Sequence, residues 1–278
     1  MTGTTPALIR VLDGGQRASR SDVVVTEEPL ELRLAAGGET RTVGITMRTP
    51  GADFELAAGF LRTEGVVADR RDIRRMDYCH DIASGEQRYN VVTVHLAADE
   101  LPTLSTLERY GTVSSACGVC GKASVEALEL RGVAPVEAEA GPQVDTATLY
   151  GLPDALRAAQ STFAATGGLH AAGLFSASGD LRCAREDVGR HNAVDKVVGW
   201  ALVKGRQDDL RTSVLVVSGR AGFDIVQKAA VTGIPMVCAV SAPSSLAVDT
   251  AARFGITLVG FLRGRHANVY AGAQRIVP

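Results

Sequence analysis

Three short apolar runs in the last third of the chain constrain its fold most. They are "SVLVVSG" (213–219), "PMVCAVS" (235–241) and "ITLVGFL" (256–262), and the segments "FDIVQKAAVTG" and "SSLAVDTAARFG" separate them. Strands that are apolar throughout, without alternation, are typical of a parallel sheet covered on both faces. The pattern therefore predicts a βαβαβ unit and an α/β fold for this part of the chain.

The first half of the chain has a different pattern. Residues 22–49 place Val, Leu and Ile at alternate positions on either side of Gly37-Gly38, which predicts a hairpin. A short helix is expected from Asp53, as its N-cap, to near Gly65. A further strand is expected at "YNVVTVHL" (89–96). This half is therefore predicted to be an α+β part, rich in strands.

Residues 132–145 form the best boundary between the two halves, because they carry Pro135, Gly141 and Pro142 and little apolar periodicity. We expect a flexible tail over 1–20, an N-terminal β-rich domain over 21–145 and an α/β domain over 146–278. In the α/β domain a helix is expected within 148–168. A hairpin that turns at 178–180 and a helix that ends at Gly205 follow it.

Charge and apolar content exclude several classes of protein. The chain has 29 basic and 31 acidic residues among 278, without the basic excess of a general nucleic-acid binder. No run approaches the roughly 18 apolar residues of a membrane span, and residues 1–15 lack the apolar core of a secretory signal. We therefore expect a cytoplasmic protein without nucleic-acid or membrane partners.

The sharpest motif is Cys117-Gly118-Val119-Cys120-Gly121-Lys122, in a small, polar segment expected to be a loop. Glycines that free the backbone and a nearby lysine both favour the thiolate form of cysteine. A redox disulfide, half a zinc site and a persulfide relay all fit this pair. A structural zinc needs about four protein ligands, and the nearest further candidates are Cys79 and His80. Cys183 and Cys238 lie in apolar strands and are expected to be inert core thiols.

The ends of the three predicted parallel strands carry the second motif. Ligands of open α/β sheets bind at the carboxyl ends of strands, where helix N-termini favour anions. The loops there contain Ser218-Gly219-Arg220, residues 241–245 and Arg263-Gly264-Arg265-His266. Ser218, Arg220, Ser244, Arg263 and Arg265 are candidates to hold a phosphate-bearing ligand. The alternative is that Ser and Gly only cap helices here.

A third group of polar residues lies within the segment 183–199, "CAREDVGRHNAVDKVVG". Such a density of polar groups near a helix start could bind a purine or order a loop, or it could be a solvated helix face with ordinary capping. His170, at a predicted strand start, is interpreted as a structural residue. The polar residues of the segment are Glu186, Asp187, Arg190, His191, Asn192, Asp195 and Lys196.

Taken together, these motifs resemble the formate dehydrogenase accessory sulfurtransferase family (FdhD). The matching segments are "SSACGVCGKAS", "REDVGRHNAVDK", "VSGRAGFDIVQKAA", "SAPSSLAVDTAARFGITLVGF" and "RGRHANVY", in the family's order from about residue 22 to 270. The resemblance implies a cytidine-deaminase-like, three-layer αβα C-terminal domain without the deaminase zinc site, beside a smaller β-rich N-terminal domain. It also implies a cytoplasmic homodimer.

The resemblance further implies an enzyme, a sulfurtransferase. Such a protein takes sulfur from a cysteine desulfurase as a persulfide and passes it to the molybdenum or tungsten bis-molybdopterin guanine dinucleotide of formate dehydrogenase. That cofactor is a bound substrate, and no metal or permanent cofactor is implied. Cys117 matches the persulfide-bearing cysteine and Cys120 its partner. The cofactor stretch matches Phe261, Leu262, Arg263, Gly264, Arg265 and His266.

Two other interpretations stay open at this point. One is a carrier or chaperone of the molybdenum cofactor that catalyses nothing and whose CxxC pair binds structural zinc. The other is a dithiol reductase that cycles through a Cys117–Cys120 disulfide.

Overall fold

A computed structural model describes residues 3–79, 89–102, 125–126, 128–129 and 131–278. Its largest unit is a six-stranded sheet in the order β13-β12-β11-β10-β8-β9. The central strands β10 (Val214–Val217), β11 (Met236–Ala239) and β12 (Thr257–Arg263) run parallel, as the three apolar runs predicted. The flanking strands β13 (His266–Ala271), β8 (His170–Phe175) and β9 (Leu181–Asp187) are antiparallel. The chain thus has a mixed α/β fold.

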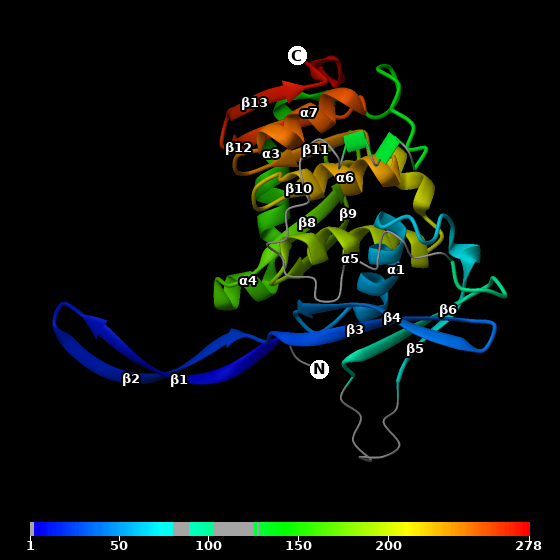
Figure 1. Ribbon diagram of the computed structural model, residues 1–278. Coiled ribbons are helices and arrows are strands. Elements are labelled where there is room, and N and C mark those ends of the chain that lie inside the picture. Colours follow the sequence, from blue (N-terminus) through cyan, green and yellow to red (C-terminus); the bar gives the residue numbers. More distant parts are fainter. Residues whose placement is uncertain (1–2, 80–88, 103–124, 127, 130) are drawn as a thin grey trace.

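Helices cover both faces of this sheet and make three layers (Figure 1). On one face α3 (Thr146–Ala158) packs its leucines against Val214, Val216, Met236, Cys238 and Val259. The intervening strand residues face α5 (Arg190–Val203), α6 (Phe223–Thr232) and α7 (Ser245–Arg253). Burial on both faces explains why these strands are apolar throughout.

A second sheet, ordered β4-β3-β6-β5, lies below the first in Figure 1. The predicted hairpin forms its β3 (Glu28–Ala36) and β4 (Glu39–Arg48), and β5 (Ile73–Tyr78) and β6 (Val91–Leu96) complete it. Helix α1 (Asp53–Thr63) packs on this sheet and contacts α5 of the α/β unit. The two sheets are therefore joined through a pair of helices.

Glycines allow α1 and α5 to cross at very short distance. A Cβ atom on Gly59 would lie 1.8 Å from the backbone oxygen of Asp195. A Cβ atom on Gly199 would lie 1.7 Å from the backbone oxygen of Glu55. Because both obstacles are backbone atoms, only glycine fits at either position.

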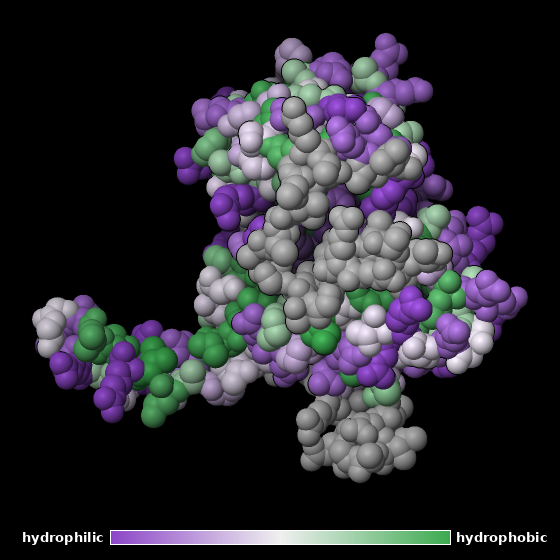
Figure 2. All heavy atoms as spheres, viewed as in Figure 1, coloured by the Kyte–Doolittle hydropathy of each residue, from purple (hydrophilic) through white to green (hydrophobic). Residues whose placement is uncertain are grey.

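The N-terminal residues differ from the sequence prediction. Residues 1–20, expected to be a loose tail, contribute β1 (Thr4–Asp13) and the start of β2 (Gln16–Val25), which pair as a two-stranded ribbon. The ribbon extends away from the body (Figure 1). Figure 2 shows apolar side chains along it, and Leu8 and Leu12 are 81% and 73% exposed. The hydrogen-bonded pairing of β1 with β2 explains why residues that composition marked as a tail form strands.

Two helix boundaries also differ from the sequence prediction. Ala52, at φ 55°, is the N-cap of α1, while the Asp53 carboxylate is buried against the Arg48 guanidinium at 3.0 Å. The helix expected within 148–168 is divided into α3 and α4 (Ser161–Thr166), with Gln160 between them. The predicted turn at 178–180 between β8 and β9 is confirmed.

The remaining elements are short. Strands β7 (Val144–Asp145) and β14 (Ile276–Val277) pair with each other in parallel. Three 3₁₀ turns occur at η1 (Arg70–Asp72), η2 (Gln207–Thr212) and η3 (Ala273–Arg275). Over the described residues, none of the helices combines the length and the apolar character needed to traverse a lipid bilayer.

Candidate ligand site at the carboxyl end of the central sheet

A cavity of about 680 Å³ lies where β10, β11 and β12 end, and we call it the sheet-end cavity. It brings together Ser218, Arg263 and Gly264, three of the residues that the sequence assigned to ligand binding. Residues of α3, α4 and the segment before β8 form the rest of the wall. They are Pro153, Asp154, Leu156, Arg157, Gln160, Phe163, Gly167, Gly168, Leu169 and His170, with Val240 after β11.

Ser218 lines the sheet-end cavity where β10 meets β8, and Gly219 follows it without lining the cavity. The Ala171 N–H donates to Ser218 Oγ at 2.9 Å, and the Ser218 N–H donates to the Ala171 carbonyl at 3.0 Å. Because the Ser218 hydroxyl accepts in this contact, its proton can still be donated to a ligand. A Cβ atom on Gly219 would lie 3.3 Å from His170 Nδ1, so the imidazole ring rests directly on Gly219.

His170 lies in a positively charged environment. Burial lowers its pKa, and the charges of Arg190, His191 and Arg220 lower it further. An imidazole with a lowered pKa is neutral near pH 7, and it can then both donate and accept a hydrogen bond. Arg220, itself exposed, contributes positive charge near the sheet-end cavity without lining it. The surroundings of the cavity therefore favour an anion.

Gln160 is one of the lining residues that sequence reasoning missed, together with Arg157 and Phe163. Its side chain lines the sheet-end cavity and is only 4% exposed. Its Nε2 is buried and has no hydrogen-bond partner in the part of the chain that the structure describes. Buried polar groups without partners are rare in native proteins and costly in free energy. The amide is thus a donor available to a ligand. No sequence pattern marked it, because residues 148–168 were expected to form one helix.

A charged plane and an aromatic ring form one wall of the cavity. The Arg157 guanidinium lies 3.9 Å from the centroid of the Phe163 ring. Glu186 fixes this wall, because its carboxylate accepts hydrogen bonds from the Thr162 N–H at 3.0 Å and the Phe163 N–H at 2.7 Å. A planar, charged wall suits a heterocycle or a phosphate group.

Other predicted ligand residues do not line the sheet-end cavity. Ser244 caps α7, since its Oγ accepts from the Ala247 N–H at 3.3 Å. Leu262 is buried in the core under α3. Phe261, at φ 52°, has the Arg263 guanidinium 6.0 Å from its ring. Arg265 and His266 are exposed at the β12–β13 turn. The capping interpretation is therefore correct for Ser244.

The polar residues of segment 183–199 form a largely buried network and not a solvated helix face. Lys196 Nζ lies 2.6 Å from the Asp187 carboxylate and donates to the Thr49 carbonyl at 2.9 Å. Lys228 Nζ lies 2.8 Å from the Asp195 carboxylate. These contacts tie α5 to β9, to α6 and to the segment after β4.

The cysteines divide into two groups. Cys183 and Cys238 are buried free thiols, as expected, and burial raises the pKa of Cys183 to about 12 and that of Cys238 still further. Both are poor nucleophiles for that reason. Cys117 and Cys120, the predicted catalytic pair, lie outside the described residues.

Comparison with known proteins identifies the family. The model of the FdhD/NarQ family matches residues 25–277. The chain belongs to this family. Among FdhD relatives described as "Sulfur carrier protein FdhD", that of Streptomyces coelicolor is 52% identical and covers 97% of this chain and 94% of its own length. The Mycobacterium tuberculosis relative is 50% identical, with 96% of each chain covered.

The likeness to FdhD proteins extends to a further relative and to a solved structure. The Thermoplasma volcanium sulfur carrier protein is 41% identical over 99% of this chain and 96% of its own. A crystal structure of a formate dehydrogenase accessory protein from Desulfotalea psychrophila superposes with a TM-score of 0.76 at 28% identity. It covers 99% of this chain and 100% of that one, so the likeness includes both sheets.

Proposed function

We propose that this chain is a cytoplasmic sulfurtransferase that carries sulfur as a persulfide on Cys117 to the cofactor of formate dehydrogenase. The observation that carries the proposal is its near-full-length similarity to sulfur carrier proteins, together with the Cys117–Cys120 pair. The sulfur donor is a cysteine desulfurase. The acceptor is a molybdenum or tungsten bis-molybdopterin guanine dinucleotide, which this chain binds as a substrate.

The sulfur step follows thiol–disulfide exchange. The Cys117 thiolate attacks the terminal sulfur of the donor persulfide, the donor S–S bond breaks, and the donor cysteine leaves as a thiolate. Delivery of the carried sulfur as sulfide requires two electrons. Cys120 supplies them when it attacks Cys117, because the sulfide leaves and a Cys117–Cys120 disulfide remains. A cellular dithiol then reduces this disulfide.

The sheet-end cavity supports the second half of the proposal. Arg263 and the Ser218 hydroxyl suit the phosphates of a guanine dinucleotide, and Gln160 Nε2 is a donor for an acceptor atom of the ligand. The cavity volume of about 680 Å³ falls within the range of small-molecule sites. Arg157 and Phe163 offer a planar wall for a ring.

Complementation tests the proposal. A strain without its own copy of this gene should regain formate dehydrogenase activity with the native chain and none with Cys117→Ala. Cys79→Ala is the matched control, because Cys79 is a partly exposed thiol outside the pair. Arg263→Gln should weaken GDP binding at least about tenfold, measured by calorimetry. Full activity in Cys117→Ala would contradict the proposal.

A further inference from the structure

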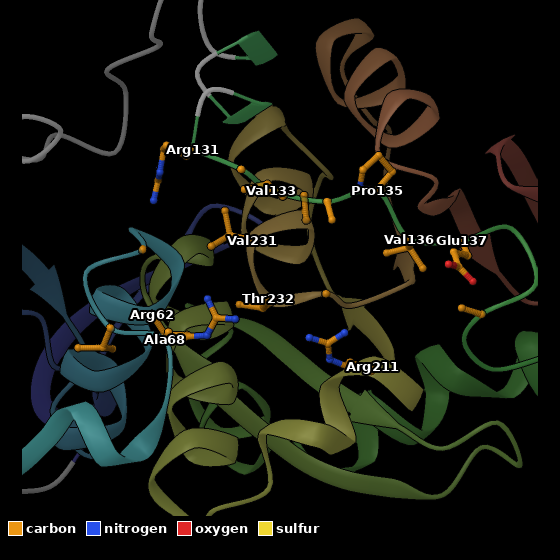
Figure 3. A pocket seen from close by; sticks show the side chains of 17 residues that line it. Arg62, Ala68, Arg131, Val133, Pro135, Val136, Glu137, Arg211, Val231 and Thr232 are labelled. Carbon is orange, nitrogen blue, oxygen red and sulfur yellow. The ribbon is translucent and has the colours of Figure 1, made fainter.

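A second cavity, of about 660 Å³, lies at the opposite end of the central sheet (Figure 3). Its wall includes Arg211 just before β10 and Thr232-Gly233 just before β11, where the parallel strands begin. The sheet-end cavity instead lies where these strands end. The two cavities are therefore separate sites.

Three arginines line this second cavity, which we call the arginine pocket: Arg62, Arg131 and Arg211. Figure 3 shows the guanidinium groups of Arg62 and Arg211 below Thr232, with Arg131 on the loop above. Glu137 is the single carboxylate among the described lining residues, and it is exposed. The pocket thus has an excess of positive charge.

Arg131 is held by the protein itself. Its guanidinium donates a hydrogen bond to the Glu64 carbonyl. It also lies against Gly65, where a Cβ atom would come within 2.2 Å of Arg131 Nη2. The position of Arg131 at the rim is therefore fixed before any ligand binds.

Arg62 and Arg211 differ from Arg131, because neither has a hydrogen bond or ion pair to another described residue of the protein. Arg211 packs its side chain over Gly233, whose Cβ would lie 3.9 Å from the Arg211 Cζ. Burial lowers the pKa of Arg62, the charge of Arg211 lowers it further, and the nearby charge of Asp72 acts in the opposite direction. Arg62 is partly buried and Arg211 is exposed, so an anion between the two guanidinium groups would offset their mutual repulsion.

Apart from Glu137 and Thr232, the other side chains that line the arginine pocket are apolar. Val133, Pro135 and Val136 come from the segment after Arg131, Val67 follows α1, and Val231 lies at the end of α6. Small-molecule sites commonly combine such an apolar lining with a few charged groups that fix orientation. A guanidinium binds phosphate with two parallel hydrogen bonds.

We propose that the arginine pocket binds a phosphate-bearing small molecule, with its phosphate between Arg62 and Arg211 and its body against the valines. This second site goes beyond the sulfur transfer proposed above and does not depend on it. The valine and proline lining favours a ligand with a planar or apolar body over a free inorganic anion.

Calorimetric titration with AMP, and with adenosine as the matched probe without phosphate, tests the proposal. AMP should bind the native chain at least about tenfold more tightly than adenosine. Arg62→Gln and Arg211→Gln should each weaken AMP binding at least about tenfold. Arg41→Gln, an exposed arginine on β4, is the control and should bind AMP like the native chain.

A second readout separates ligand binding from a structural role of the arginines. Without ligand, Arg62→Gln should keep or raise the unfolding temperature, because it removes like-charge repulsion that an anion normally relieves. Absence of AMP binding to the native chain would overturn the proposal. Binding that only Arg263→Gln weakens would also overturn it, since AMP would then occupy the sheet-end cavity. Neither result would bear on sulfur transfer.

Discussion

At the scale of single residues, Gln160 is the clearest case of a buried polar side chain whose hydrogen bonding the described part of the chain leaves incomplete. Its Nε2 is buried without a hydrogen-bond partner among the described residues, and Leu156 of α3 lines the same cavity. An unsatisfied buried donor costs about 1–3 kcal/mol. Such a cost is expected at sites where binding supplies the missing partner.

Replacement of Gln160 by Met should separate stability from binding. Gln160→Met keeps the shape of the side chain and removes the unpaired donor, so the free energy of unfolding should stay equal or rise by about 1 kcal/mol. GDP binding should weaken. Urea denaturation and calorimetry measure the two effects, with Gln143→Met, an exposed glutamine, as the control. A clear loss of stability without any change in GDP binding would contradict the ligand role.

His170 predicts a pH dependence of stability. Because its pKa is lowered in the folded chain, the unfolded chain binds more protons as the pH falls through about 6.5. The native chain should therefore lose stability between pH 7 and pH 5, and His170→Gln should lose less. Uptake of one full proton on unfolding changes the free energy of unfolding by roughly 1.4 kcal/mol per pH unit. The difference between the two proteins should be a fraction of that value, since the His170 ring is only half buried.

The control for His170 is His266→Gln, which changes an exposed histidine on β13. Its urea-unfolding profile between pH 5 and pH 7 should match that of the native chain. His170 also faces Arg190, His191, Arg220 and Asp187, and the comparison leaves all of these unchanged. Equal pH slopes for the native chain and His170→Gln would contradict the account.

At the scale of elements, the crossing of α1 and α5 determines how the two sheets are joined. Gly59→Ala or Gly199→Ala places a Cβ atom within 2 Å of a backbone oxygen of the other helix. Overpacking in a core typically costs about 1–3 kcal/mol, and rigid backbone obstacles favour the upper end. Urea denaturation should therefore show a loss of about 3 kcal/mol.

Gly151→Ala in α3 provides the control for that crossing. No atom lies within 4 Å of its added Cβ, so helix propensity alone should act. The expected change is a gain of about 0.5–1 kcal/mol in the free energy of unfolding. If alanine at Gly59 and Gly199 were as harmless as at Gly151, the close crossing would be refuted.

Local patterns predicted those elements whose environment is uniform. Strands buried on both faces are apolar throughout, which predicted the βαβαβ unit. Strands buried on one face alternate between apolar and polar residues, which predicted the β3–β4 hairpin. The ribbon of β1 and β2 left no such trace, since both of its faces are largely exposed. The N-cap of α1 was misplaced because Asp53 pairs with Arg48, a contact that spacing alone does not reveal.

At the scale of the whole molecule, the candidate site could be predicted only where it follows from topology. Ser218, Arg263 and Gly264 converge because parallel strands end at one edge. The packing of α3 and α4 against this edge of the sheet adds Arg157, Gln160 and Phe163 to the cavity wall. Such packing joins segments that are far apart in the sequence, so local patterns do not predict it. The buried pairs of Lys196 and Lys228 likewise depend on contacts across the fold.

The β1–β2 ribbon predicts how two copies of the chain associate. Leu8, Leu12 and Val23 lie on one face of the ribbon by its register and are exposed. An isolated two-stranded ribbon is marginally stable in water, so a second copy that covers this face would stabilise it. We expect a homodimer in sedimentation equilibrium.

The double variant Leu8→Ser, Leu12→Ser should shift this equilibrium toward monomer at least about tenfold. Val269→Ser, which changes an exposed valine on β13, is the control and should remain dimeric. A native chain that sediments as a monomer, or a double variant that dimerises like the native chain, would refute the role of the ribbon.

Intact mass after incubation with a cysteine desulfurase and cysteine tests the central proposal most directly. The native chain should gain the mass of one sulfur atom, and a reductant should remove it. Cys117→Ala should gain none, while the control Cys79→Ala should behave like the native chain. A native chain that gains no sulfur, or a Cys117→Ala variant that gains as much as the native chain, would contradict persulfide transfer through Cys117.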